Sequence, residues 1–148
     1  MKRAILISLA LAFACACGGD KNMNATREPS SKEVQIIISN PAAGPIKVTA
    51  DPDPATIGRD GVVKWTLIYK AGPALDSVVI DGFKDAKGAT DPFDGGSTFT
   101  FGYVASGTSE PTQTSGLPNK GGDFKYNVTV TVAGQPPVLV DPRLIVNY

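Results

Sequence analysis

The sequence has no histidine, one tryptophan and two cysteines, and it has no excess of charge of either sign. Without histidine, the usual general base for a serine or cysteine nucleophile is missing, and no Ser-x-x-Lys spacing offers a replacement. Lysine plus arginine and aspartate plus glutamate each number 14. Such a balance gives no reason to expect the basic face that nucleic-acid binding requires. We therefore expect neither a histidine-dependent enzyme nor a nucleic-acid partner.

The two cysteines, Cys15 and Cys17, are separated by one residue. This spacing gives poor geometry for a disulfide. Two thiolates without further cysteine or histidine ligands also do not complete a zinc site. We expect no cofactor and no redox or metal role for the pair.

Long hydrophobic runs are absent as well. The longest apolar stretch, 4–14, has 11 residues and is broken only by Ser8. A membrane-spanning helix needs roughly 20. The stretch follows Lys2 and Arg3 and ends in small residues, which is typical of a secretory signal peptide. We assign residues 1–16 to such a signal.

Residues 14–18 read Ala-Cys-Ala-Cys-Gly and resemble the lipobox of bacterial lipoproteins. The resemblance implies that Cys17 becomes the lipidated first residue and anchors the protein to a membrane. The position three before the acceptor is usually leucine and is Ala14 here. With Cys15 as the acceptor, Phe13 would stand where a small residue is expected, so Cys17 fits better than Cys15. Because Gly18 follows the acceptor instead of aspartate, the resemblance favours the outer membrane.

Residues 17–32 are polar and have almost nothing to bury. Such a segment cannot offset its ordering entropy, so we interpret it as a tether. Loss of residues 1–16 leaves 12 basic and 14 acidic residues, a net charge of −2. Residues 33–148 are enough for one domain with one core.

From residue 33 onward the apolar pattern has a period of two, as expected for strands. It is clearest in 63–69, 99–103 and 124–132, and weaker in 33–38, 46–50, 74–80, 136–140 and 143–148. The pair Asp141-Pro142 predicts a bend, a bulge or an edge position between the last two. Alternation of apolar and polar faces is typical of antiparallel strands that pack one face on a core. We predict an all-β domain, an antiparallel two-sheet sandwich of about seven or eight strands without substantial helix.

Two segments, GRDGVVKWTL (58–67) and GGDFKYNVTVTV (121–132), resemble the strands of immunoglobulin-like and cupredoxin-like sandwiches. In both groups a strand with an inward tryptophan recurs, followed by a glycine-led aromatic strand near the C-terminus. Cupredoxins bind copper through two histidines, a cysteine and often a methionine. This chain has no histidine and no cysteine after Cys17, so a copper site of that kind cannot form.

The acidic residues of the loops allow two interpretations. Extracellular β-modules often collect calcium ligands from such loops, which makes Asp91 and Asp94 candidates for a weak calcium site. Asp-Pro and Asp-Gly pairs are also simply what turns require, and we favour that explanation. The longest break between predicted strands is Val104–Gly122. Loops of this length are either functional or disordered.

These observations favour a non-catalytic, lipid-anchored protein of the bacterial cell envelope. Its partners would be the membrane, through the N-terminal lipid, and an envelope protein or glycan met through strand edges or the Val104–Gly122 loop. Two alternatives stay open. One is a soluble secreted ligand-binding sandwich, cleaved after Ala14 or Ala16 without lipid. The other is a hydrolase that depends on carboxylates alone.

Overall fold

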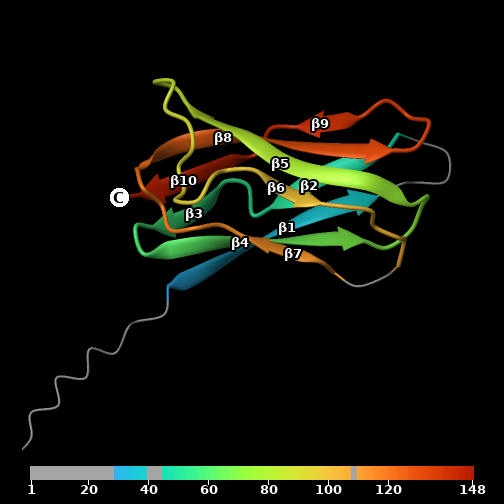
Figure 1. The fold of residues 1–148 in the computed structure, drawn as a ribbon, viewed down its shortest axis with the longest axis horizontal. Coiled ribbons are helices and arrows are strands. Elements are labelled where there is room, and N and C mark those ends of the chain that lie inside the picture. Colours follow the sequence, from blue (N-terminus) through green and yellow to red (C-terminus); the bar gives the residue numbers. More distant parts are fainter. Residues whose placement is uncertain (1–28, 40–44, 108–109) are drawn as a thin grey trace, which may run out of the picture.

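A computed structural model describes residues 29–39, 45–107 and 110–148. Those ranges contain ten strands and no helix, which confirms the all-β prediction. The number of strands exceeds the seven or eight expected. The strands form two sheets that face each other (Figure 1).

The first sheet, sheet A, has the strand order β2-β1-β4-β7. Its members are β1 (Ser30–Ser39), β2 (Lys47–Asp51), β4 (Gly61–Tyr69) and β7 (Thr112–Thr114). β1 pairs with β4 in parallel, from Ser30 opposite Gly61 to Ile38 opposite Tyr69. The predicted antiparallel arrangement is therefore confirmed only in part, because most strand pairs are antiparallel but β1 and β4 are not. Parallel neighbours need a crossover connection, and here the chain passes through β2 and then β3 of the other sheet before it returns as β4.

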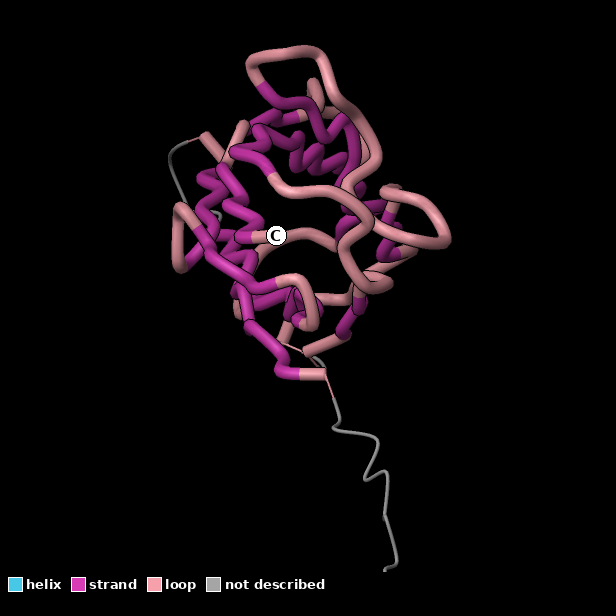
Figure 2. The backbone as a smooth tube through the Cα atoms, turned by 90° about the vertical axis from the view of Figure 1, so that its left-hand side faces the viewer, coloured by secondary structure: helices cyan, strands magenta, loops and turns pink. Residues whose placement is uncertain are grey.

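The second sheet, sheet B, has the order β3-β10-β8-β5-β6, and β9 also pairs with β8. Its members are β3 (Ala55–Gly58), β5 (Leu75–Asp85), β6 (Phe99–Phe101), β8 (Gly122–Val132), β9 (Val138–Val140) and β10 (Arg143–Asn147). β3 and β10 are parallel, so this sheet is mixed too. β2 lies beside β9 and β6 beside β7, so the sheets approach each other at both edges. Figure 2 views the domain along its strands and shows them curling around the interior.

The predicted interruption at Asp141-Pro142 is confirmed. Both β9 and β10 pair with β8, and the register continues unbroken from Val140 opposite Val128 to Arg143 opposite Lys125. The carbonyl of Pro142 accepts the backbone N–H of Tyr126 at 3.0 Å. Proline lacks an N–H of its own to donate, so the two strands are one strand interrupted at this pair.

The described residues of the segment Val104–Gly122 are more ordered than the sequence predicted. Val104 exchanges two backbone hydrogen bonds with Leu75, each 2.9 Å long, and Thr112–Thr114 pairs with β4. β7 is a short, polar edge strand, partly or fully exposed. It has no buried face, so apolar alternation does not mark it.

β1 begins at Ser30, three residues before the expected start of the domain at residue 33. Ser30, Ser31 and Lys32 pair with the first residues of β4. Their side chains are exposed, and hydrophobic periodicity therefore does not extend to them. The domain thus includes the last three residues assigned to the tether.

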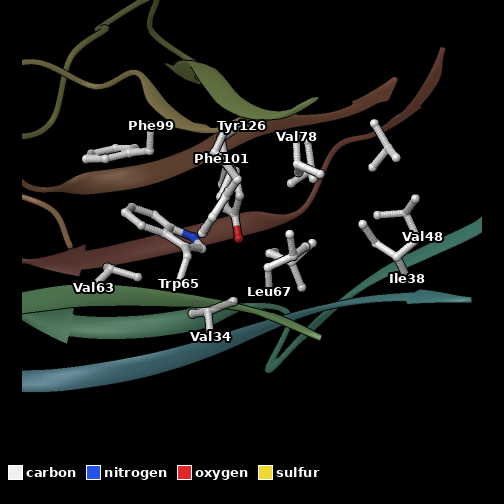
Figure 3. Close-up of a cluster of buried hydrophobic side chains, with 14 of the residues drawn as sticks. Val34, Ile38, Val48, Val63, Trp65, Leu67, Val78, Phe99, Phe101 and Tyr126 are labelled. Atoms are coloured by element: carbon white, nitrogen blue, oxygen red, sulfur yellow. The ribbon is translucent and has the colours of Figure 1, made fainter. Parts of the chain in front are cut away.

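The core is centred on Trp65 of β4, which is completely buried. Its ring lies 4.5 Å from that of Phe99, centroid to centroid, and between 6.1 and 6.3 Å from those of Phe83, Phe93 and Tyr126. Figure 3 shows the indole projecting from β4 toward Tyr126 and Phe99 of sheet B. The inward tryptophan expected from the strand pattern is confirmed.

Tyr126 is almost fully buried next to Trp65. Burial raises the pKa of its phenol to about 12, and the indole N–H of Trp65 lies close enough to lower that pKa in part. The two groups face each other without reaching hydrogen-bond geometry, and neither has another partner among the described residues. A buried hydroxyl without a partner is a local cost to stability.

Replacing Tyr126 with phenylalanine should alter the pH dependence of stability. The folded-state pKa of about 12 lies above the ordinary value of 10.0. The folded protein therefore keeps the proton that the unfolded chain loses between pH 10 and 12, and stability falls as pH rises through this window. The wild type should lose about 2–3 kcal/mol there that Tyr126→Phe does not lose.

Urea denaturation below pH 10 and near pH 12, followed by Trp65 fluorescence, measures this difference. Tyr103→Phe removes an exposed hydroxyl and controls for the loss of a phenol as such. Parallel stability curves for wild type and Tyr126→Phe across the window would contradict the prediction.

Candidate functional site

The predicted acceptor Cys17 and the alternative Cys15 lie outside the described residues. The expectation of lipidation therefore remains a prediction from sequence. Across residues 29–39, 45–107 and 110–148, no helix is long and apolar enough to cross a membrane.

Asp91 and Asp94, the calcium candidates, are both exposed in the segment between β5 and β6. Asp91 has a φ of 52°, a left-handed conformation that aspartate tolerates in turns. The backbone N–H of Asp94 donates to the carbonyl of Leu117 at 2.9 Å. Within the described part of the chain, no three or more histidine, cysteine, aspartate or glutamate residues are grouped to hold a metal ion.

Two other aspartates accept hydrogen bonds from backbone N–H groups, one locally and one across the fold. The Oδ1 of Asp85 accepts the backbone N–H groups of Lys87 and Ala89 at 2.9 and 2.7 Å. The Oδ1 of Asp53 accepts the N–H of Arg143 at 2.8 Å. The Asp85 contacts support the interpretation that the acidic loops are turn-forming, whereas the Asp53 contact joins the segment before β3 to the start of β10.

The outer face of sheet B carries a row of three cations that the sequence analysis missed. Lys125 on β8 lies opposite Lys84 on one side and opposite Arg143 on the other. Like charges placed directly opposite each other are unfavourable. Two of them are neutralised, since Lys125 Nζ lies 3.1 Å from an Asp141 oxygen and Arg143 pairs with the Asp123 carboxylate. Lys84 has no ion pair with any residue that the structure describes.

A β-bulge in β5 comes directly before Lys84, which also lines a hollow beside this row. The register between β5 and β8 shifts between Asp81 and Lys84, and Gly82 has a φ of 65°. The hollow has a volume of about 680 Å³ and is lined by Lys84, Asp85, Ala86, Asp123, Lys125 and Arg143. The only signal in the sequence is the isolated glycine in VVIDGFK, because a glycine inside a strand often marks a bulge.

This charged hollow presents both cationic and anionic side chains, and its Asp123 carboxylate is a poor general acid. The Arg143 guanidinium lowers the pKa of Asp123 by hydrogen bonding to its carboxylate. A general acid at neutral pH needs the opposite, a raised pKa. The hollow therefore offers hydrogen-bond donors and acceptors that can contact charged or hydroxyl-rich groups.

A second hollow lies at the end of the sandwich that carries the C-terminus. It has a volume of about 550 Å³ and is lined by Pro29 and Ser30, the turn 58–60, Leu117 and Asn147. A third, more apolar hollow of about 400 Å³ lies at the opposite end of β1 and β4, around Ile37, Ile68 and Lys70.

No protein-family model, no curated protein and no solved structure matches this chain.

Proposed function

We propose that this chain is a lipid-anchored protein of the bacterial cell envelope whose β-sandwich is a non-catalytic interaction or structural module. The observation that carries the proposal is the N-terminal sequence: two basic residues, an apolar stretch of 11 residues and small residues before Cys17. A thiol can carry a diacylglyceryl group, and two or more acyl chains hold a protein firmly on a membrane. The resemblance to lipoproteins with glycine after the acceptor favours the outer membrane.

The position of the domain in the chain is consistent with anchoring. β1 begins at Ser30, so a short polar segment separates Cys17 from the folded part. As a coil, such a segment spans on the order of 20 Å. The domain would therefore stay close to the membrane surface.

The finer assignment of the sandwich, immunoglobulin-like or cupredoxin-like, is part of the same proposal. The buried Trp65 and the buried Tyr126 on a late strand support it. The parallel pairing of β1 with β4 departs from a purely antiparallel arrangement.

The charged hollow on sheet B is the surface we propose for an envelope protein or glycan partner. Lys84 supplies an uncommitted cation, and Asp85 and Asp123 supply acceptors. Hydroxyl-rich and charged ligands are recognised by such a mixture of donors and acceptors. The Asp123 carboxyl, with its lowered pKa, supports a binding role over a carboxylate-dependent hydrolase.

The anchor is tested by expressing the chain in a Gram-negative host with labelled palmitate. The wild type and Cys15→Ser should incorporate the label and partition with membranes, whereas Cys17→Ser should take no label because its acceptor thiol is gone. The mature mass identifies the cleavage site. A soluble, unlabelled wild-type protein would refute the anchor and favour a free ligand-binding sandwich cleaved after Ala14 or Ala16.

A further inference from the structure

We propose that one end of the sandwich rests against the lipid surface, so that the domain has a fixed orientation on the membrane. This inference depends on the anchor at Cys17 proposed above. We call this end the terminal face. It consists of Pro29, Ser30, the β3–β4 turn with Arg59 and Asp60, Leu117 and the C-terminal Tyr148.

The backbone arrangement gathers these residues from four separate parts of the chain. Ser30, where β1 begins, pairs with Gly61 at the start of β4. The backbone at Gly121 packs so closely on Tyr148 that an added Cβ would lie 2.7 Å from the tyrosine Cβ. Leu117 lines the same 550 Å³ hollow as Pro29 and Ser30. The segment that leads to Cys17 therefore joins the domain on this face.

The exposed chemistry of the terminal face suits an interface between water and lipid. Leu117 and Tyr148 are 45% and 68% exposed, and they are two of the four exposed large hydrophobic side chains among the described residues. The Arg59 guanidinium lies 5.8 Å from the centroid of the Tyr148 ring. Tyrosine is enriched at membrane interfaces, and arginine is suited to lipid phosphates.

Attraction between charged side chains and lipid headgroups is not the main basis of the proposed contact between the terminal face and the membrane. The Arg59 Nε lies 3.7 Å from an Asp60 carboxylate oxygen, and both side chains are largely exposed. Such a pair is weak, but it leaves the face close to neutral. The contact would rest on the apolar side chains and on the short tether, which gives the terminal face a high effective concentration at the bilayer.

The opposite end of the domain lies much farther from the anchor. The ten residues of β1 span about 33 Å at roughly 3.3 Å per residue. Tyr103 lies near that far end, because Val104 pairs with Leu75 just after the turn that follows β4. Leu139 lies on sheet B opposite Thr129, seven residues along β8 from Gly122 and so well away from the terminal face. These two residues are the other exposed large hydrophobics, and they serve as matched controls.

The test uses the full lipidated protein with single substitutions Leu117→Cys, Tyr148→Cys, Leu139→Cys and Tyr103→Cys. Each variant carries an environment-sensitive fluorophore on the introduced thiol, since Cys17 is acylated and Cys15 is removed with the signal. The variants are reconstituted into vesicles of phosphatidylethanolamine and phosphatidylglycerol that contain a headgroup-quencher lipid. Trp65 fluorescence verifies that each variant is folded.

We expect quenching at positions 117 and 148 to be several-fold stronger than at positions 139 and 103. Equal quenching at all four positions, or none, in protein that carries the palmitate label would overturn the orientation and leave the anchor intact. A second outcome is that the probes at positions 117 and 148 are shielded from water to a degree that rises with protein concentration and does not respond to the quencher lipid. That result would mean that the terminal face contacts a second copy of the chain, and it would overturn the membrane contact. A protein without lipid would refute both proposals.

Discussion

Replacing Trp65 with alanine is expected to lower the free energy of unfolding by about 3–5 kcal/mol. The indole is completely buried and packs against four aromatic rings of the core. Truncation removes those contacts and leaves a cavity that strands on two sheets cannot close without shifting. Because small domains are stable by only about 5–15 kcal/mol, this single change should remove a large share of the stability.

Urea denaturation followed by far-ultraviolet circular dichroism measures the loss, since the variant has no tryptophan to report fluorescence. Ile68→Ala is the matched control. Ile68 lies on the same strand with its side chain half-buried on the outer face, so its truncation should cost about 1 kcal/mol. A Trp65→Ala protein as stable as Ile68→Ala would show that the core is not centred on this ring.

Replacing Gly116 with alanine is expected to destabilise the domain by about 3 kcal/mol. A Cβ at this position would lie 2.0 Å from the carbonyl oxygen of Asp94. That oxygen belongs to the backbone, and the neighbouring N–H of Asp94 is held by Leu117 through a hydrogen bond of 2.9 Å. The clash therefore forces apart two backbone segments that pair with each other.

The adjoining residue makes this segment hard to move. Ser115 is buried, its backbone N–H donates to the carbonyl of Val63 at 2.9 Å, and its hydroxyl accepts the N–H of Val63 at 3.0 Å. Gly102→Ala is the control, because nothing lies within 4 Å of an added Cβ there. Thermal unfolding of both variants should show a clear loss for Gly116→Ala alone, and equal melting temperatures would contradict the clash.

The alternation along β4 and β8 was sufficient to identify the inward faces. Val63, Trp65, Leu67 and Tyr69 are buried as the pattern predicts, and the aromatic and valine residues of β8 are too. In a strand that packs one face on a core, apolar and polar residues must alternate, whichever strand is its neighbour. Burial by face is therefore a local property that the sequence carries.

The sequence did not reveal which strands are neighbours. Alternation of apolar and polar residues is compatible with both parallel and antiparallel pairing. The pattern therefore did not predict the parallel pairs β1–β4 and β3–β10. β7 was missed for a related reason: as an exposed edge strand it has no buried side to mark it. Pairing partners and edge strands are decided by how the whole chain packs.

The candidate functional features also differ in whether the sequence alone reveals them. The predicted signal, the lipobox-like residues around Cys17 and the polar segment after them are contiguous in the chain, so they can be recognised from the sequence. The row of Lys84, Lys125 and Arg143 joins three strands, and the terminal face joins Leu117, Tyr148 and Arg59 from distant positions. The sequence by itself determined the all-β class, the inward faces and the predicted anchor, because these depend on neighbouring residues. The strand order, the hollows and the terminal face were decided only by the tertiary structure, because they depend on contacts between residues far apart in the chain.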